Sequence, residues 1–296
     1  MVEKVVFSKQ KWGNKSNQGE KPMNYLIRNG CQRIVQIEDI REETATIKTF
    51  FFRDKLCRLA KPGQFVMVWI PEVDEVPMSL SFMNDFGLSG VTVERVGEAT
   101  EALHGKAIGD IIGIRGPFGN FFRPVNEKVA LIGGGTGLAP LLPLIEVLKE
   151  SGATITFVLG FKTSREMFFL GRVQGLLADK KHRILMTTED GSHGQKGLAT
   201  DILESLLRGE RFHTIYTCGP EPMMRKVFDI AEERNIHVQV CFERIIRCSV
   251  GLCGSCVIGK FRVCKEGLVL SSEELREVLD EFGRFKRDFD GRRSKL

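Results

Sequence analysis

Four cysteines near the C-terminal end of the chain have the spacing of a metal or cluster site. The segment 248–264 reads CSVGLCGSCVIGKFRVC, and it holds four of the chain's eight cysteines at C-x4-C-x2-C-x7-C. Gly251 and Gly254 let the backbone curl so that thiolates and amide N–H groups point to one centre. The first three cysteines follow the plant-type ferredoxin pattern, which favours a 2Fe–2S cluster.

Two other uses of these cysteines stay open. Four thiolates also make a closed tetrahedral zinc site. Zinc ribbons usually pair two short-spaced cysteine couples, however, whereas four residues separate Cys248 from Cys253. A disulfide framework is disfavoured because the rest of the chain has the character of an intracellular protein.

Two glycine-containing segments in the second half of the chain have the residue types of a nucleotide site. The segment GGGTG at 133–137 follows an apolar run and opens a helical pattern, so backbone N–H groups could hold a diphosphate. Its spacing departs from G-x-G-x-x-G, and a tight turn without a ligand is the alternative. Cys218, Gly219 and Pro220 end another apolar run, where Cys218 could touch a nicotinamide or be a small buried thiol.

The first half of the chain carries three weaker motifs. In PMSLS, at 77–81, Ser79 offers a hydroxyl and a backbone N–H that could meet the redox-active nitrogen of a flavin. The segment GEAT at 97–100 provides backbone donors and a hydroxyl for a second diphosphate. The segment GPFGN at 116–120 is a turn that joins the two halves. Most such turns in proteins bind nothing, so each motif alone proves little.

Short β-type runs separated by Gly, Pro, Asn and Asp extend from residue 31 to about 122, and this pattern predicts a small antiparallel barrel or sandwich. After residue 125, apolar strands alternate with helical stretches, which indicates βαβ units on a parallel sheet. The expected strands are 33–37, 45–52, 64–70, 90–96, 110–115, 129–135, 153–160, 183–190, 214–220 and 238–243. Ligands of a parallel sheet bind at the carboxyl ends of its strands, where the glycine segments fall.

We therefore predict a β-barrel plus α/β fold: an antiparallel barrel, a parallel-sheet domain and a C-terminal cysteine module. The expected parts are a flexible polar extension (1–28), the barrel (29–125), the α/β domain (126–236), the cysteine module with a helix (237–282) and a frayed charged tail (283–296). Ser271 and Glu274 have capping-box spacing, which predicts a helix that runs to about residue 285.

Composition excludes several classes of function. The net charge of +5 is mild, and the basic residues form no stripe interleaved with aromatics, so nucleic acid is not an expected partner. The uncharged run 129–145 contains glycines and prolines that argue against a membrane span. The first 22 residues lack an apolar run of signal-peptide length, so we expect a cytoplasmic protein.

The order of these motifs resembles the ferredoxin–NADP reductase superfamily along residues 30–235. With the cysteine module appended, residues 30–282 resemble the family of electron-transfer subunits of NAD-dependent dihydroorotate dehydrogenases. Further matches are TEDGSHGQKG at 188–197 and FER at 242–244.

The resemblance implies FAD in the barrel, NAD(H) at the sheet edge and a 2Fe–2S cluster on Cys248, Cys253, Cys256 and Cys264. It makes Ser79 and Cys218 catalytic, with Ser79 facing the isoalloxazine and Met78 packing on it. Gly97 and Thr100 would hold the FAD diphosphate, and Gly134 to Thr136 the NAD diphosphate. The full set of implied cofactor contacts is Pro77, Met78, Ser79, Leu80, Gly97, Thr100, Gly116, Gly134, Gly135, Thr136, Gly137, Cys218, Gly219 and Pro220.

The resemblance also implies a partner. We expect a permanent complex, as a heterotetramer, with an FMN-containing dihydroorotate dehydrogenase subunit, in which electrons pass through FMN, the cluster and FAD to NAD. Apolar residues around the module should stay partly exposed as the interface. These are Ile245, Ile246, Val250, Leu252, Val257 and Ile258.

Related subunits of NAD(P)H–ferredoxin transhydrogenases and sulfhydrogenases are the alternative. By likeness, the transhydrogenase subunits have aspartate as the first cluster ligand, where this chain has Cys248. A zinc-bearing interaction module is an alternative of another class.

Two details depart from the superfamily pattern or stay open. An arginine that pairs with FAD phosphate often precedes the proline of the serine motif, and this chain has Val76 there; Arg95 could replace it. Lys162 and Arg165 could reach a ribose 2′-phosphate or be solvated surface charges, so the choice between NAD and NADP is open, with the resemblance favouring NAD.

Overall fold

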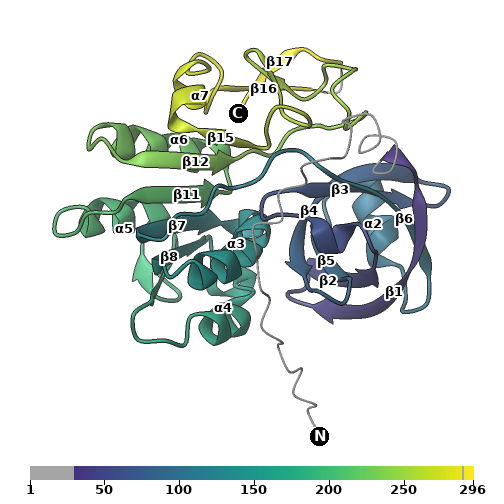
Figure 1. Ribbon diagram of the computed structural model, residues 1–296, viewed down its shortest axis with the longest axis horizontal. Helices are drawn as coiled ribbons and strands as arrows, with labels where there is room; N and C mark the ends of the chain where they lie inside the picture. The colour runs from purple at the N-terminus through teal and green to yellow at the C-terminus, as the bar shows by residue number, and fades with distance from the viewer. Residues whose placement is uncertain (1–29, 289) are drawn as a thin grey trace, which may run out of the picture.

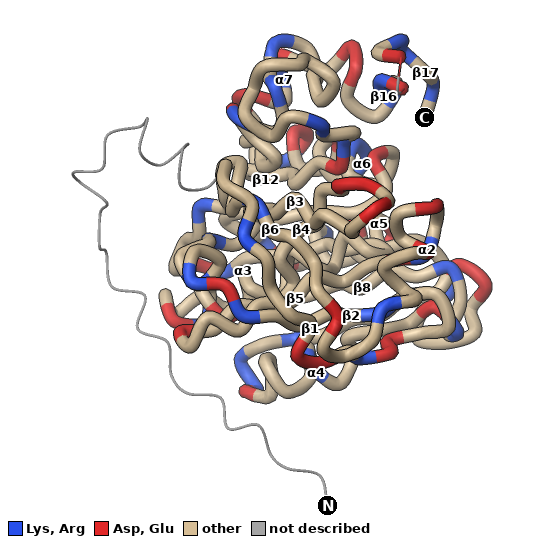
Figure 2. Tube along the Cα trace, turned by 90° about the vertical axis from the view of Figure 1, so that its right-hand side faces the viewer, with Lys and Arg blue, Asp and Glu red and all other residues tan. Residues whose placement is uncertain are grey.

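The computed structural model describes residues 30–288 and 290–296, so the polar extension expected over residues 1–28 lies outside the described residues. Figure 1 shows a barrel beside an α/β domain, with the C-terminal segment lying along one end of the sheet. Lys and Arg are interspersed with Asp and Glu along the trace (Figure 2). In the described part of the chain, no helix is long and apolar enough to cross a membrane.

The barrel is closed and antiparallel, with the strand order β1-β2-β5-β4-β3-β6. Alternation along β3 shows how the sequence forms it: Val66, Val68 and Ile70 lie in the barrel core, whereas Phe65 and Met67 join the core of the α/β domain. This strand therefore faces both halves of the protein. The barrel elements are β1 (Arg33–Glu42), β2 (Ile47–Arg53), β3 (Phe65–Ile70), β4 (Asp74–Met83), β5 (Leu88–Glu94), α2 (Glu98–His104) and β6 (Ile111–Phe118).

The α/β domain is a seven-stranded sheet in the order β10-β9-β8-β7-β11-β12-β15. All neighbouring strands are parallel except the last pair, so the predicted parallel sheet is confirmed. Its first strands are β7 (Lys128–Gly134), β8 (Thr154–Phe161), β9 (Arg183–Thr188), β10 (Gln195–Lys196), β11 (Thr214–Cys218) and β12 (His237–Cys241), and its helices are α3 (Leu138–Glu150), α4 (Leu170–Leu176), α5 (Ala199–Leu206) and α6 (Glu221–Glu232).

The cysteine module continues the sheet. Its strand β15 (Val269–Ser271) pairs antiparallel with β12, with Cys241 opposite Val269. A small hairpin, β13 (Val257–Ile258) with β14 (Phe261–Arg262), precedes it. Sequence analysis had not predicted that the module would add a strand to the sheet.

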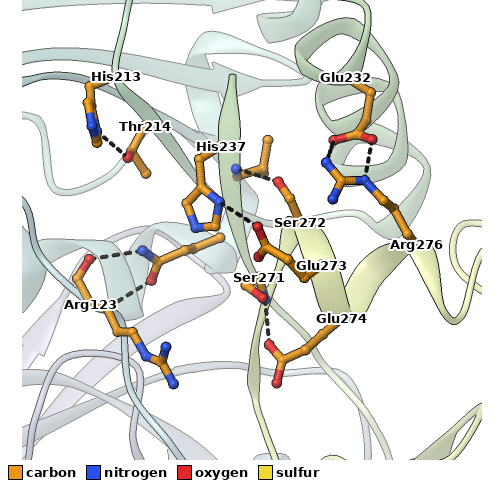
Figure 3. Close-up of polar contacts among 12 residues, drawn as sticks. Arg123, His213, Thr214, Glu232, His237, Ser271, Ser272, Glu273, Glu274 and Arg276 are labelled. Atoms are coloured by element: carbon orange, nitrogen blue, oxygen red, sulfur yellow. Dashed lines mark hydrogen bonds and ion pairs between the residues drawn. The ribbon is translucent and has the colours of Figure 1, made fainter. Parts of the chain in front are cut away.

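The helix after β15 starts as predicted but ends early. Ser271 N–H donates to a Glu274 carboxylate oxygen at 2.8 Å, as the capping box requires (Figure 3). The helix is α7 (Ser272–Arg276), and turns replace the expected continuation to about residue 285. Arg276 at its end pairs with Glu232 of α6 at 2.7 Å, which ties the module to the sheet domain (Figure 3).

The tail expected to be frayed is folded, so that expectation was wrong. It forms the hairpin β16 (Phe285–Arg287) with β17 (Arg293–Lys295). Its anchor is the buried Glu281, which pairs with Arg293 and accepts a hydrogen bond from Gly259 N–H at 3.0 Å. Part of the charge of the tail is therefore used in contacts within the folded chain.

Two contacts fix the barrel against the α/β domain. Helix α3 packs on β4 as well as on β7 and β8. From α4, the Arg172 guanidinium donates to the Ser81 carbonyl at 2.8 Å and lies 5.0 Å from the ring centroid of Phe82. Burial lowers the pKa of Arg172 to about 10, which still leaves it charged at neutral pH.

The Asn120 side chain joins the barrel-to-sheet connection to the cysteine module. Its amide donates to the Val269 carbonyl at 2.5 Å and its oxygen accepts from Val269 N–H at 2.8 Å. Asn120→Ala should lower the free energy of unfolding by about 2 kcal/mol, because buried backbone groups lose their partner. Urea-induced unfolding measures this loss, with the exposed Asn126→Ala as the control. A loss below about 0.5 kcal/mol, the range of neutral surface changes, would contradict the expectation.

Candidate functional site

The carboxyl ends of β7 and β11 approach each other so closely that only glycine fits. A Cβ built on Gly137 would lie 2.4 Å from the Gly219 Cα atom. Gly219 itself has φ +146°, which L side chains rarely adopt, and its Cβ would lie 2.7 Å from the Gly134 carbonyl oxygen. The two predicted glycine segments thus meet at one edge of the sheet.

Three cavities meet around this edge, and Glu243 lines all of them. We name them the sheet-edge cavity (about 520 Å³), the central cavity (about 210 Å³) and the outer cavity (about 990 Å³).

The sheet-edge cavity lies over the glycine turn. Gly134, Gly135 and Thr136 line it together with Gly219 and Pro220. Gly135 has φ +53°, and a Cβ there would meet open space, so its backbone faces a cradle that a ligand can approach. Six charged side chains also line this cavity, namely Glu94, Lys162, Glu166, Glu189, Lys226 and Glu243. Arg165, which the sequence analysis named with Lys162 as able to reach a ribose 2′-phosphate, does not line the cavity.

The central cavity brings residues of three regions together. Pro77, Met78 and Ser79 come from β4 of the barrel, and Thr136, Gly137 and Cys218 come from the sheet edge. The third region is the segment from Cys241 to Ile246, which leads directly to the cysteine module.

The outer cavity extends from the barrel to the C-terminal hairpin. Val76, Val96 and Thr100 form the barrel side, and Gly219 and Pro220 the sheet side. Lys286 and Arg287 of β16 also contribute to its wall.

Some predicted residues lie elsewhere. The Leu80 side chain is buried in the barrel core, and Gly116 lies in β6, where its carbonyl accepts from Arg33 at 2.8 Å. Neither lines any of the three cavities. Gly97 precedes α2 beside open space, but the Thr100 hydroxyl already accepts from Gly97 N–H at 2.9 Å and donates to its carbonyl. That hydroxyl is therefore occupied by capping α2.

A buried ion pair lies between the central and outer cavities, and sequence reasoning missed it. Arg244 donates to both Glu221 carboxylate oxygens, one of them at 2.8 Å, and its guanidinium lies 5.2 Å from the Phe242 ring centroid. Glu221 also accepts from Gly283 N–H at 2.9 Å. The two residues are 23 positions apart, so no local spacing signals the pair. The Nε atom of Arg244 is buried without a hydrogen-bond partner among the described residues.

The four cysteines of the module lie near enough to one another to interact. Cys248 and Cys253 interact with each other, and so do Cys256 and Cys264. Backbone N–H groups donate to their sulfurs: Leu252 N–H to Cys248 at 3.3 Å, and Cys264 N–H to Cys256 at 3.4 Å. Across residues 30–288 and 290–296, no three metal-binding side chains converge as around a single ion.

The exposure of the module is uneven. Cys256 and Cys264 are buried, at 2% exposure each, whereas Cys253 is exposed. Of the apolar residues expected at an interface, Ile246 and Ile258 are buried, and Leu252 is 85% exposed.

The thiols of the site differ in acidity. Contact with the Cys241 thiol and burial raise the pKa of Cys218 well above its ordinary value, so Cys218 keeps its proton at neutral pH. Burial alone would raise the pKa of Cys248, but N–H donors from the backbone of Cys253, Val250 and Leu252 outweigh it and lower the pKa to about 7. Hydrogen bonding from Cys264 lowers the pKa of Cys256 to about 7 as well.

Comparison with known proteins identifies the parts. The family described as oxidoreductase NAD-binding domain matches residues 131–229, and the family described as iron-sulfur cluster binding domain of dihydroorotate dehydrogenase B matches residues 243–276. A solved NADH-dependent reduced ferredoxin-NADP oxidoreductase is 29% identical, with a TM-score of 0.75 over 84% of this chain and 92% of that one. The cytochrome b5 reductase domain of Ulva prolifera nitrate reductase shares the fold at 19% identity and a TM-score of 0.59, over 70% of this chain and 94% of that one.

The matches to curated relatives span most of this chain and nearly the whole length of each relative. A protein of Methanocaldococcus jannaschii is 43% identical over 88% of this chain and 97% of its own, and one of Pyrococcus horikoshii is 39% identical over 88% and 97%. Both are named probable dihydroorotate dehydrogenase B (NAD(+)), electron transfer subunit.

The barrel, the sheet and the cysteine module together define an NAD-linked flavoprotein reductase with an iron–sulfur domain. The chain belongs to the family of dihydroorotate dehydrogenase B electron transfer subunits. Its cofactors are FAD, a 2Fe–2S cluster and NAD(H), as the sequence predicted.

The acidity of Cys248 can be tested on the chain after chelation and reduction have removed its cluster. Because its pKa is lowered to about 7, the thiolate forms as the pH rises through 7, and alkylation by iodoacetamide should be half-maximal there. Peptide mass spectrometry resolves each cysteine. The fully buried Cys57, whose pKa burial raises well above the ordinary value, is the internal control and should stay unlabelled until the chain unfolds. A midpoint for Cys248 at or above pH ~8.5, the value of an ordinary thiol, would contradict the assignment.

Proposed function

We propose that this chain carries electrons between NAD(H) and a partner subunit that oxidises dihydroorotate to orotate, a step of pyrimidine biosynthesis. The observation that carries the proposal is the wall of the central cavity. Ser79 of the barrel, Thr136 and Cys218 of the sheet edge and the segment leading to the cysteines all line this one space. A flavin held there lies between a nicotinamide site and a cluster site.

The barrel side of the central cavity receives the isoalloxazine. Ser79 has no side-chain hydrogen bond among the described residues, so its hydroxyl is available to the flavin, while Met78 supplies an apolar surface from β4. When bound, FAD accepts a hydride from nicotinamide and can give up electrons singly, which a cluster requires. The protonated Cys218 thiol offers a neutral contact where the nicotinamide enters.

The sheet-edge cavity receives NAD(H). The turn from Gly134 to Thr136 supports a diphosphate, because Gly135 faces open space and Thr136 lines both this cavity and the central one. Thr136 therefore lies where the nicotinamide half of NAD(H) would extend from the sheet-edge cavity toward the barrel.

The cysteine module forms the other end of the path. Cys248, Cys253, Cys256 and Cys264 are the proposed cluster ligands, supported by their spacing, their proximity to one another and the N–H donors to the sulfurs of Cys248 and Cys256. Leu252 and Cys253 are exposed side by side in the chain, so the partner would dock there. We propose an FMN-containing partner, a heterotetramer and a cytoplasmic location.

The charge pattern of the sheet-edge cavity favours NAD(H) over NADP(H). Its four acidic side chains outnumber its two cations and would repel a 2′-phosphate. The acids are Glu94, Glu166, Glu189 and Glu243, and the cations are Lys162 and Lys226. Glu189→Gln should raise kcat/KM for NADPH relative to NADH by about tenfold. Stopped-flow reduction of the bound FAD by each nucleotide measures the ratio. The control is Glu38→Gln on β1, which should leave the ratio unchanged, and a wild-type preference for NADPH would refute the reasoning.

Purification of the chain together with its partner subunit tests the proposed function. The tagged chain, expressed at native level, should co-purify with an FMN-bearing subunit, and the complex should reduce NAD+ when given dihydroorotate. The relatives' shared name supports this outcome. Cys248→Ser should abolish dihydroorotate-dependent NAD+ reduction but leave FAD reduction by NADH in place, with the exposed Cys31→Ser as the control.

Co-purification with a hydrogenase or a ferredoxin-dependent subunit instead would still support the electron-transfer role. It would refute dihydroorotate as the substrate of the complex. Equal loss of FAD reduction by NADH in Cys248→Ser would overturn the proposed position of the cluster beyond the flavin.

A further inference from the structure

Position 76 leaves the outer cavity without the positive charge that the superfamily often places there. Val76 lies in β4 and contributes only an apolar side chain to the cavity wall. The replacement suggested by the sequence, Arg95, does not line the cavity and pairs with the exposed Glu101 at 3.6 Å. If the cavity holds a dinucleotide phosphate, its counter-charge must come from the other cations of the wall. These are Arg244 and Arg247 beside the sheet edge and Lys286 and Arg287 of the hairpin.

The C-terminal hairpin brings cationic side chains to the same cavity. Lys286 and Arg287, adjacent on β16, both line it. Figure 2 shows blue segments on both strands of this hairpin. The hairpin is held in place because Glu281 pairs with Arg293 and lies 4.0 Å from Arg287, while also accepting from Gly259 N–H of the cysteine module.

Two of the four acidic residues that line the outer cavity are engaged by other cations. Glu75 pairs with Arg115 at 2.5 Å, and Glu221 is held by Arg244. Asp74 and Glu243 are the other acidic residues of the wall, and both are exposed to solvent. Among the described residues, no ion pair joins Lys286 to an acid of the wall, and Arg287 lies 4.0 Å from Glu281, which does not line the cavity.

Two buried donors of this wall lack acceptors. The Nε atoms of Arg244 and Arg287 are buried without a hydrogen-bond partner among the described residues. Arg244 is nine-tenths buried, and Arg287 uses its other nitrogens on the Gly291 carbonyl and Glu281. Guanidinium groups are the side chains best suited to phosphate oxygens, which accept several hydrogen bonds at once.

We propose that the C-terminal hairpin, through Lys286 and Arg287, binds the phosphate groups of FAD in place of the arginine missing at position 76. The inference rests on the proposed function, since it requires FAD to extend from the central cavity into the outer one. It makes a segment that the sequence marks as a charged tail part of the cofactor site.

The test compares FAD affinity of the deflavinated full-length chain and its variants by flavin fluorescence. The double variant Lys286→Gln/Arg287→Gln should bind FAD at least about tenfold more weakly. The control Arg292→Gln/Lys295→Gln removes the same charge from the same hairpin at positions that do not line the cavity, and should match the wild type. Added salt should narrow the difference, because it screens the phosphate contacts.

A third variant tests the site itself. Val76→Arg, added to Lys286→Gln/Arg287→Gln, restores a guanidinium to the same cavity and should recover most of the lost affinity. The melting temperature of each flavin-free variant should match that of the wild type.

A loss of less than about tenfold in the double variant, or an equal loss in the control, overturns the hairpin assignment. That result leaves the proposed function standing as long as the wild-type chain binds FAD. A wild-type chain that binds no FAD would overturn the proposed function itself.

Discussion

The buried ion pair between Glu221 and Arg244 joins the parts of the site. Glu221 begins α6 of the α/β domain, Arg244 lies in the segment that leads to the cysteines, and Gly283 N–H of the tail donates to the same carboxylate. Removing one partner of such a buried pair typically costs about 3–5 kcal/mol, because the other charge is left without compensation. The central and outer cavities are both walled by Arg244, so their shapes depend on this contact.

Rigid connections also fix the cysteine module relative to the flavin cavity. Strand β15 extends the sheet, Asn120 hydrogen-bonds to Val269, and Arg276 of α7 pairs with Glu232 of α6. The module is thus bonded to the sheet along its backbone and through side chains at two further points. Electron transfer between fixed centres benefits from such a frame, since the distance between them stays constant.

Local sequence patterns made much of the fold and of the candidate site predictable. Apolar runs ending in glycine gave the strands of the parallel sheet, and the cysteine spacing indicated the cluster domain. Long-range pairing could not be predicted: the Glu221–Arg244 pair spans 23 residues and follows no periodic pattern. The tail was misjudged because its charges are used by Glu281, a contact that only the folded chain reveals. Leu80 belongs to a motif that lines the site, yet side-chain alternation turns it into the barrel core. Gly116 lies in β6, and no residue of its motif lines the three cavities.

The antiparallel strand β15 has a protective consequence for the parallel sheet. Without it, β12 would end the sheet with a row of unpaired N–H and C=O groups, a template on which other chains can add strands. β15 covers that edge with a strand only three residues long, followed at once by α7. The cysteine module therefore also protects the sheet from edge-to-edge aggregation. A chain truncated after β12 would lose solubility as well as the cluster site.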